Sequence, residues 1–511
     1  MILNCYFQGI LRSQQIRQVI KCGRMASSKA SHAEEDKFLK DVFDLSMRQT
    51  VQKSRDRCTP VLNFRTPQEI QGRIDLGLHP AGESNGEVLK LCEKVFENSV
   101  NTGHPRFFNQ LFAGLDSYGF AGSIMLDALN TQGHTYEISP ALTVIELEVV
   151  KHMLKFVGYE GGEGTFNPGG SYSNMLAMNV ARIRNFPDSK VTGVSGLPLL
   201  VNFCSEQSHY SAQKNSALLG FGEANCKPVK CDERGKMIPE DLEKSILEAK
   251  EKGAAPFFVT ATAGTTVLGA FDPFNEIADI CERHNIWLHV DGAWGGSALL
   301  SEKHKHLCNG VERSDSFAWN PHKLMAAPVQ TSVLLLKEKD LLRKSHSLNV
   351  PYLFQDDKPY DTSYDLGRSL VACGRKCDAF KLWVMWKSRG DSGFEKQIDK
   401  ALDNAKYLTE AVKNHPHFRL VIPELEFTNV PFWYVPPSLR GETENEEFFT
   451  KLGKIVPIVK KRMQISGLVL VGYTSLPNIP TFFRMTIANE QVEKEDLDFL
   501  LAEIERNAAD L

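Results

Sequence analysis

From about residue 120 onward, short apolar runs alternate with helical patterns, and this alternation restricts the folds that the chain can adopt. Runs with the length and residue types of buried strands occur at 199–203, 256–260, 286–290 and 333–336. Helical patterns lie between them, at 239–252 and after Asp272, which we expect to be an N-cap with Pro273 as the first helical residue. Repeated strand–helix–strand order predicts a mainly parallel sheet covered by helices on both faces. In such a sheet, ligands bind beyond the carboxyl ends of the strands.

The two ends of the chain have different patterns. Helical spacing at 36–48 and 87–99, joined by a proline-containing connection at 59–80, predicts a first section without strands. The last section mixes helices and strands, at 392–413, 430–434, 445–464, 468–473, 482–487 and 493–506. We therefore expect four parts: a disordered basic tail at 1–34, a helical segment at 35–115, a large α/β domain at 116–385 and a small α+β domain at 386–511. The helical segment has no sheet of its own and is expected to pack on another domain or subunit.

Composition excludes several classes of function. The net charge is −4, from 59 basic and 63 acidic residues spread along the chain, which argues against a nucleic-acid or membrane-surface partner. No apolar run approaches the ~20 residues of a membrane span. The eleven cysteines include the pairs Cys226/Cys231 and Cys373/Cys377, which lack further zinc ligands nearby. We expect free thiols, a reducing compartment and no metal site.

The N-terminal 32 residues contain five basic residues and no Asp or Glu, a composition compatible with a mitochondrial presequence. The alternative is a disordered basic tail, partly upstream of a second start at Met25. We favour the tail and a cytoplasmic location.

Two residues with complementary chemistry follow neighbouring apolar runs. Asp291 comes directly after 286–290, and Lys323 follows the apolar residues 317–319 in the sequence Asn320-Pro321-His322-Lys323. A lysine amine forms a Schiff base with an aldehyde cofactor when its surroundings keep part of it neutral. A carboxylate keeps the pyridine nitrogen of such a cofactor protonated. A lysine after a strand is usually only a surface charge, so the pair needs a third element.

That third element is the sequence Gly169-Gly170-Ser171, which opens a helical pattern. Backbone N–H groups at a helix N-terminus bind phosphate, and neither the Walker nor the dinucleotide spacing is present. Alone, the segment is an ordinary loop-to-helix turn. His209 and Thr262 follow two further strands and would lie at the same edge of the sheet. The imidazole of His209 could stack on a pyridine ring there, although a lone histidine is more often structural, and Thr262 could reach the cofactor. Together these features predict pyridoxal 5'-phosphate as the cofactor.

Nine short motifs in order carry a resemblance to a known family. They are HPRFFNQ (104–110), TYE (135–137), GGSYSN (169–174), GTT (264–266), FDP (271–273), DGAW (291–294), NPHK (320–323), YLFQ (352–355) and FFR (482–484). With these motifs the chain resembles the group II pyridoxal phosphate-dependent amino acid decarboxylases, in the acidic branch of cysteine sulfinate, aspartate and glutamate decarboxylases. The resemblance implies the fold of the fold-type I (aspartate aminotransferase-like) enzymes. It also implies a homodimer with shared active sites, in which the segment at 35–115 of each chain packs on the partner chain. A mobile loop would close over the active site.

The resemblance further implies a role for each candidate residue. Lys323 would carry the cofactor as a Schiff base, Asp291 would pair with the pyridine nitrogen, and His209 and Ala293 would cover the two faces of the ring. The remaining cofactor contacts would come from Gly170, Ser171, Thr262, Asn320 and His322.

Three further residues would contact the substrate and one would deliver a proton. Tyr352 would protonate Cα after carbon dioxide leaves, and Arg484 would hold the substrate carboxylate beside Gln110. His134 stands where this branch usually has Phe or Tyr; as a pocket residue it would alter the choice among acidic substrates, and otherwise it makes no contact. Gly292 stands in the usual place of alanine, which we expect to loosen the turn.

We therefore expect α-decarboxylation of a small acidic amino acid, cysteine sulfinate (to hypotaurine) or aspartate (to β-alanine). The alternative is glutamate decarboxylation to GABA. Two further alternatives are a pyridoxal phosphate enzyme that makes an aldehyde and an inactive binding homologue. The presence of Tyr352 and His209 together favours simple decarboxylation.

Overall fold

The computed structural model describes residues 29–112 and 114–511, so most of the expected tail at 1–34, with the possible presequence, lies outside the described residues. The tail prediction is wrong for residues 29–34, because they form the first turns of helix α2 (Lys29–Ser46). The chain forms two compact units, which we describe separately. The first comprises residues 29–53 and Arg65–Ser99, and the second comprises Ser54–Phe64 and Val100–Leu511.

The first unit is helical, as its sequence pattern predicts. It contains α2, the π-helical turn η1 (Met47–Gln52), α3 (Pro67–Arg73) and α4 (Asn85–Glu97). α3 falls inside the stretch that we expected to be only a connection. Its start has a recognisable signal, because Thr66 and Glu69 form a reciprocal capping box and Pro67 occupies the first turn.

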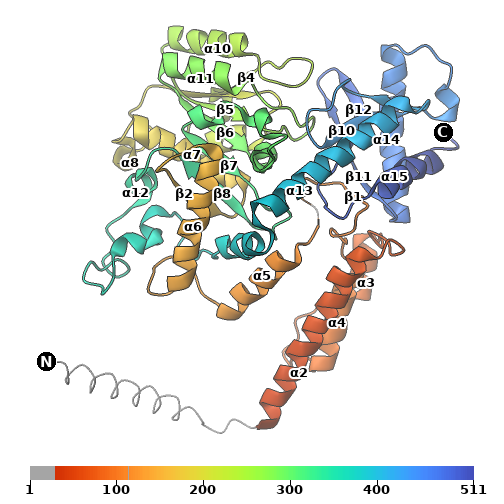
Figure 1. Cartoon of the computed structure of the whole chain (residues 1–511), viewed down its shortest axis with the longest axis horizontal. Helices are drawn as coiled ribbons and strands as arrows, with labels where there is room; N and C mark the ends of the chain where they lie inside the picture. Colours follow the sequence, from red (N-terminus) through yellow and green to blue (C-terminus); the bar gives the residue numbers. More distant parts are fainter. Residues whose placement is uncertain (1–28, 113) are drawn as a thin grey trace. The chain divides into compact units, whose positions relative to one another are not determined.

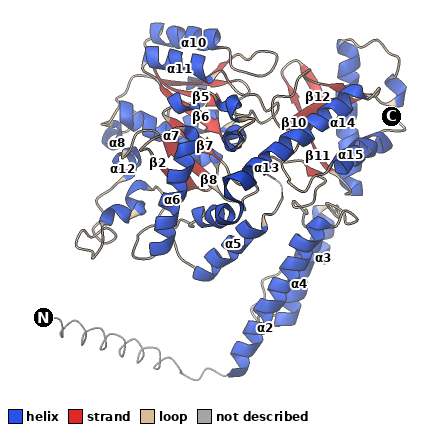
Figure 2. Cartoon of the chain, viewed as in Figure 1, coloured by secondary structure: helices blue, strands red, loops and turns tan. Residues whose placement is uncertain are grey.

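The second unit is built around a seven-stranded sheet with the order β2-β8-β7-β6-β5-β3-β4 (Figures 1 and 2). The strands are β2 (Glu163–Asn167), β3 (Leu200–Ser205), β4 (Cys226–Val229), β5 (Ala255–Thr262), β6 (Trp287–Gly292), β7 (Ser316–Trp319) and β8 (Ser332–Leu336). β4, β3, β5, β6 and β7 are parallel, and β8 runs antiparallel to both of its neighbours. The prediction of a mainly parallel sheet is therefore confirmed.

Helices cover both faces of this sheet. One face packs against α7 (Gly170–Asn185) and α12 (Leu341–His346), and the other packs against α6 (Pro140–Val157), α10 (Pro239–Glu251) and α11 (Phe274–His284). α5 (Ser117–Leu129), α8 (Ser189–Thr192) and α9 (Ser211–Leu218) complete this part. Short 3-10 helices connect the elements of the unit: η3 (Glu223–Asn225), η4 (Gly295–Leu300), η5 (Lys305–Cys308), η6 (Val311–Arg313), η7 (Thr362–Tyr364), η8 (Leu366–Ser369) and η9 (Pro437–Leu439).

Asp272 does not cap α11, contrary to expectation. The helix begins at Phe274, and the N-cap position is Pro273. The buried carboxylate of Asp272 instead accepts the backbone N–H groups of Met237 and Thr262, both at 2.7 Å. It therefore ties the end of β5 to a neighbouring loop.

A second sheet has five strands in the order β1-β11-β12-β10-β9 (Figure 2). They are β1 (Phe107–Phe108), β9 (Phe418–Leu420), β10 (Asn429–Tyr434), β11 (Leu470–Leu476) and β12 (Ile479–Thr486), with α14 (Glu446–Ser466) and α15 (Lys494–Asn507) packed on them. β1 pairs with β11 in parallel. Residues 100–112 thus belong to this unit, although we expected them in a strandless N-terminal segment, because two residues are too few for a strand pattern.

Helix α13 (Ala379–Asn414) crosses the expected domain boundary at 385/386 (Figure 1). It is bent at Gly390, whose φ of 62° and ψ of −178° are not helical. Its first part and Phe394 pack in the core of the seven-stranded sheet, and Ala405, Leu408 and Val412 pack in the core of the five-stranded sheet. None of the helices in the described part of the chain combines the length and apolar character that a membrane span requires.

Candidate active site

The candidate residues gather at the carboxyl edge of the seven-stranded sheet. Thr262 ends β5 and stands in register with Asp291 near the end of β6. Asn320 follows the end of β7 directly, and its backbone oxygen accepts the N–H of Lys323 at 2.9 Å. Parallel strands place their carboxyl ends at one edge, so residues far apart in the sequence meet there.

Lys323 is half-buried, and the charges of Asp291 and Arg484 both act on its amine. Burial lowers the pKa of its amine, the guanidinium of Arg484 lowers it further, and the carboxylate of Asp291 raises it. The net effect is a lowered pKa, which increases the neutral fraction of the amine. A neutral amine is the form that attacks an aldehyde.

Asp291 is held as a buried acceptor with two donors. Its Oδ1 accepts the N–H of Ala293 at 3.0 Å, and its Oδ2 accepts Nδ2 of Asn174 at 2.8 Å. Only 7% of Asp291 is exposed, so these bonds replace most of its water. The carboxylate is fixed in direction, as a partner for a cationic ring nitrogen must be.

Behind Asp291, a chain of buried hydrogen bonds continues from Asn174 to the far end of β6. Nε1 of Trp287 donates to Oγ of Ser316 at 2.8 Å, and this hydroxyl lies 2.8 Å from Nδ1 of His289. Nε2 of His289 lies 3.0 Å from Oδ1 of Asn174. Burial lowers the pKa of His289 to about 4, so the ring is neutral. Because the amide oxygen of Asn174 can only accept, Nε2 of the neutral ring carries the proton and donates to it, and Nδ1 accepts from the Ser316 hydroxyl.

The same asparagine also reaches His209. Nδ2 of Asn174 donates to Oγ of Ser211 at 3.1 Å, and this oxygen lies 2.9 Å from Nδ1 of His209. The backbone N–H of Ser211 donates to the same Nδ1 at 3.2 Å, so the proton of the neutral ring is on Nε2. Burial lowers the pKa of His209, with Lys323 acting in the same direction and Asp291 opposing. One array therefore orients both the carboxylate and the imidazole.

The N-terminus of α7 forms a cradle beside Asn320. The N–H groups of its first turn have no acceptor within the helix. A Cβ on Gly170 would lie 2.7 Å from Nδ2 of Asn320, so only glycine allows this close approach. Oδ1 of Asn320 accepts Oγ of Ser332 at 2.6 Å, which leaves Nδ2 as a donor. Ser171 is exposed, and its backbone oxygen accepts Nδ2 of Asn215 at 2.9 Å. Helix N–H groups, an amide and a hydroxyl are a donor set that suits the phosphate of the cofactor.

Thr262 and His322 occupy less direct positions. Oγ1 of Thr262 lies 3.3 Å from Oγ of Ser208, next to His209 in the sequence. The ring of His322 contacts the backbone of Thr331 through Nδ1, and burial lowers its pKa to about 4. His322 therefore braces the loop that carries Lys323.

Arg484 lies on β12, opposite Gly472 of β11 and Pro431 of β10. Its Nη2 donates to the backbone oxygen of Asn109 at 3.0 Å, and its Nη1 donates to that of Thr266 at 3.2 Å. Its Nε is buried and has no acceptor among the described residues. Gln110, next to Asn109, is exposed. The structure thus brings Arg484 toward Lys323 and leaves donor capacity on its guanidinium.

Neither His134 nor Tyr352 makes a side-chain hydrogen bond to Lys323 in the described part of the chain. His134 is buried, its ring centroid lies 5.3 Å from that of Phe354, and neither ring nitrogen has a partner among the described residues. Burial lowers its pKa, so the ring is neutral. Tyr352, two residues before Phe354, is 79% exposed. The structure links His134 to the loop of Tyr352, an arrangement that the sequence did not predict.

Gly292 has a spatial role and not the expected role of loosening a turn. It is the buried last residue of β6, and its φ is not positive. A Cβ at this position would lie 2.3 Å from Cζ of Phe317 on the neighbouring strand. Glycine here makes room for the phenyl ring.

Asn174 and His289 are the site residues that sequence reasoning missed. A weak signal for His289 was present, because residues two apart on a strand share a face and His289 precedes Asp291 by two. Asn174 lies one turn after Gly170 on α7, in a motif to which we had assigned only phosphate binding. Their hydrogen bonds join four separate segments, α7, α9, β6 and β7, and have no local sequence signature.

Comparisons with known proteins agree with this geometry. A family model described as the pyridoxal-dependent decarboxylase conserved domain matches residues 67–435. The acidic amino acid decarboxylase GADL1 of Bos taurus is 49% identical over 477 residues, covering 93% of this chain and 91% of the relative. The cysteine sulfinic acid decarboxylase of Homo sapiens is 49% identical over 475 residues, covering 93% and 96%. The crystal structure of mouse CSAD matches with a TM-score of 0.91 at 47% identity, covering 94% of this chain and 99% of that chain.

Proposed function

Because this chain belongs to the pyridoxal-dependent decarboxylase family, we propose that it decarboxylates cysteine sulfinate and aspartate in preference to glutamate. The chain is a carboxy-lyase with pyridoxal phosphate as its cofactor, and acidic amino acids are its substrate class. The observation that carries the finer proposal is 49% identity across 93% of the chain to relatives named for cysteine sulfinic acid and acidic amino acids. The products would be hypotaurine and β-alanine.

Four groups of this chain would hold the cofactor. The lowered pKa of Lys323 supports its role as the amine that binds the aldehyde. The carboxylate of Asp291 accepts two hydrogen bonds that fix its direction, which supports its role at the pyridine nitrogen. The N-terminus of α7 with Asn320 would bind the phosphate, and His209 would cover one face of the ring.

Bound in this way, the cofactor supplies an electron-poor ring that takes up the electron pair left on Cα when carbon dioxide departs. Asp291 would keep a proton on the ring nitrogen, because the buried carboxylate stabilises the positive charge there. Arg484 would bind a carboxylate or sulfinate of the substrate through its two-pronged guanidinium and so orient the bond that breaks. Tyr352 would then deliver a proton to Cα.

We also propose a homodimer in which the exposed Tyr352 of one chain serves the other chain's site. Exposed apolar side chains on α5 and α6 support the homodimer. Tyr118, Met125 and Leu129 lie seven and four residues apart on α5, and Val144 and Leu147 lie on α6, all at least 37% exposed. Contiguous exposed apolar faces are typical of subunit interfaces. Light scattering should give twice the 57.3 kDa chain mass, and the double variant Met125→Lys, Leu129→Lys should shift the protein toward monomer.

A cytoplasmic location is proposed on chemical grounds. All cysteines among the described residues are free thiols, including the buried Cys204 and Cys226 whose sulfur atoms are 3.6 Å apart. Free thiols at this spacing are typical of a reducing compartment. Fractionation of cells that express the full chain would test it, and recovery in mitochondria would contradict it.

The experiment on function is a panel of four substrates with the purified enzyme. Carbon dioxide release is measured with cysteine sulfinate, aspartate, cysteate and glutamate, and aldehyde and peroxide are measured in parallel. We expect the highest kcat/KM for cysteine sulfinate or aspartate. A higher value for glutamate, or aldehyde in proportion to carbon dioxide, would overturn the proposal.

Attachment of the cofactor is tested separately. Borohydride reduction followed by peptide mass analysis should add a pyridoxyl mass to the peptide that contains Lys323. Lys323→Ala should abolish the labelling and the activity. Lys339→Ala is the matched control, because Lys339 is an exposed lysine nearby on the chain. Labelling elsewhere would contradict the role of Lys323.

A further inference from the structure

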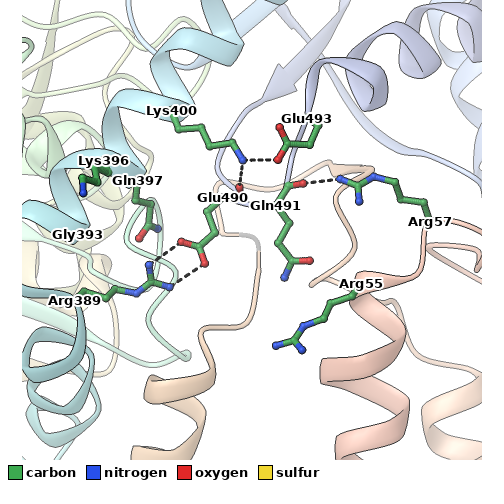
Figure 3. A pocket seen from close by; sticks show the side chains of 10 residues that line it. All are labelled: Arg55, Arg57, Arg389, Gly393, Lys396, Gln397, Lys400, Glu490, Gln491 and Glu493. Atoms are coloured by element: carbon green, nitrogen blue, oxygen red, sulfur yellow. Dashed lines mark hydrogen bonds and ion pairs between the residues drawn. The ribbon is translucent and has the colours of Figure 1, made fainter.

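A cavity of about 680 Å³ lies outside the candidate active site, in the second unit. Three segments line it (Figure 3): the end of the 3-10 helix η2 (Lys53–Arg55) with Arg57, helix α13, and the connection between β12 and α15. Its volume falls in the range of about 300–1,000 Å³ that small-molecule sites occupy. None of the residues assigned to the cofactor or substrate lines it.

The lining carries five cationic side chains and two carboxylates. The cations are Arg55, Arg57, Arg389, Lys396 and Lys400, and the carboxylates are Glu490 and Glu493. Positive charge therefore exceeds negative charge by three, from five minus two. Like charges gathered around a cavity repel one another unless counter-charges are present.

Three of these cations have carboxylate partners. Arg57 pairs with the buried Asp496 at 2.9 Å, Arg389 pairs with Asp116 and with Glu490, and Lys400 pairs with Glu493 at 2.7 Å. These pairs hold the walls of the cavity in place, as the dashed lines of Figure 3 mark for those drawn.

The other two cations, Arg55 and Lys396, have no ion pair with any described residue. Figure 3 shows the guanidinium of Arg55 extending into the space that faces α13, with the side chain of Gln491 directed to the same space. The amide group of Gln491 makes no hydrogen bond to a described residue. Two unpaired cations and an amide donor thus line one cavity.

We propose that this cavity binds a small multivalent oxyanion, phosphate or a polycarboxylate, through Arg55 and Gln491, with Lys396 adding to the positive charge of the lining. The fork of an arginine matches phosphate or carboxylate oxygens, and an anion with several charges is also attracted by the unpaired charge of Lys396 in the same lining. The inference does not depend on the reaction at Lys323, because it concerns other residues and a ligand that does not react.

The cavity wall is connected to the segment of Lys323. Gln397 lines the cavity and donates from Nε2 to the backbone oxygen of Leu324 at 2.9 Å. Its Oε1 is buried and has no donor among the described residues. An anion that fixes this wall of α13 therefore also stabilises the chain next to the catalytic lysine, and its binding raises the stability of the folded enzyme.

The test is thermal unfolding of the complete holoenzyme in increasing phosphate or citrate, with chloride at matched ionic strength as the reference. The variants Arg55→Gln and Lys396→Gln each remove one unpaired cation. Neither variant deprives a carboxylate of an ion-pair partner. Lys406→Gln is the matched control, because Lys406 is exposed on the same helix and does not line the cavity. Carbon dioxide release from the same preparations confirms that each variant is folded.

We expect phosphate or citrate to raise the midpoint temperature of the natural protein and of Lys406→Gln beyond the effect of chloride. Arg55→Gln should need about tenfold more anion for the same rise, because a charge-assisted contact is lost. Lys396→Gln should need a smaller excess of anion, because it removes only a charge that acts at a distance. A response to only one of the two anions identifies the source. Equal responses in all variants, or no response beyond chloride, would overturn the proposal.

Discussion

At the scale of the residue, the amide of Asn174 joins three groups of the candidate active site. It donates to Asp291 and toward His209 through Ser211, and it accepts from the neutral His289. Each of these contacts is buried, where an unpaired polar group costs about 1–3 kcal/mol. We regard Asn174 and His289 as positioning residues, since they would act on the cofactor only through Asp291 and His209.

We predict that Asn174→Leu weakens cofactor binding by about tenfold or more, because it leaves the carboxylate of Asp291 with one donor fewer. The cofactor dissociation constant is measured by fluorescence titration, and the pH dependence of the visible cofactor band is recorded beside it. Asn179→Leu is the control on the same helix, since Asn179 bonds to His346 and Arg182 outside the site. Unchanged cofactor affinity in Asn174→Leu would contradict the positioning role.

A second prediction concerns Gly292. Gly292→Ala would place a methyl group 2.3 Å from the phenyl ring of Phe317 in the buried sheet, so we expect a loss of about 1–3 kcal/mol in the free energy of unfolding. Phe317→Leu alone should also destabilise, because it leaves a cavity. The double variant should be more stable than the sum of the single effects implies. Strict additivity in denaturant unfolding would show that the two side chains do not compete for space.

At the scale of the residue, sequence patterns best predicted the positions of residues at the ends of strands. Asp291 and Lys323 follow apolar runs, so their meeting at one edge follows from the parallel sheet. The buried partners of Asp291 depend on how α7 packs across the sheet, which no local pattern specifies. The ring of His134 against Phe354 likewise depends on two segments more than 200 residues apart.

At the scale of the element, the bend of α13 at Gly390 is a backbone requirement. Its φ of 62° and ψ of −178° are accessible to glycine and strained for other residues. A Cβ there would meet no atom within 4 Å, so crowding plays no part. The bend redirects the helix between the cores of the two sheets.

We predict opposite effects for two Gly→Ala changes with equally open surroundings. Gly390→Ala should lower the free energy of unfolding by about 1–3 kcal/mol, because alanine disfavours this conformation. Gly86→Ala in α4 should raise it by up to about 1 kcal/mol, because alanine favours a helix. A Cβ at Gly86 also meets nothing within 4 Å. Circular dichroism during thermal unfolding measures both, and effects of the same sign would contradict the backbone explanation.

Sequence patterns identified several of the long elements, but missed the long helices α5 and α6 as well as the shortest strands. Helices of thirteen residues or more, such as α10 and α14, have enough turns to show a periodic apolar face. β1 has two residues and β4 has four, so neither shows a pattern. Asp272 was misassigned because a carboxylate before a proline resembles a cap, whereas its actual donors come from other strands and loops.

At the scale of the whole molecule, buried imidazoles govern the response to acid. Burial lowers the pKa of His104, His289 and His322 to about 4 each. Between pH 6.5 and 4 the unfolded chain binds protons at these histidines that the folded chain does not bind, so stability falls as the pH falls. Asp272 acts in the opposite direction, because burial raises its pKa to about 7 and the folded chain keeps its proton. Burial also lowers the pKa of His134, His209, His304 and His346 and raises that of Glu163, Asp315 and Asp378. Seven histidines against four acids among the described residues leave a net loss.

We predict that the midpoint temperature of unfolding decreases steadily from pH 6.5 to pH 4.5. Each depressed histidine contributes up to about 1.4 kcal/mol per pH unit in this window. His104→Asn removes one of these histidines and should flatten the decrease, since asparagine does not titrate. A decrease equally steep in the variant would exclude His104 as a cause.

The division of the chain into domains was predicted less well than its fold class. The expected boundary at 385/386 was placed where the composition changes, but α13 continues through it. A helix that serves two cores has apolar residues along its whole length, so its pattern contains no break at which a boundary would show.

The continuity of α13 limits how this enzyme can be engineered. A cut at residue 385, for split reporters or for separate production of the C-terminal part, would remove Phe394 and Ile398 from the core to which they contribute. Each fragment would expose apolar core residues to water and aggregate on its own. Permutation or insertion is better directed to exposed turns such as that near Gly441, where nothing lies within 4 Å of an added side chain.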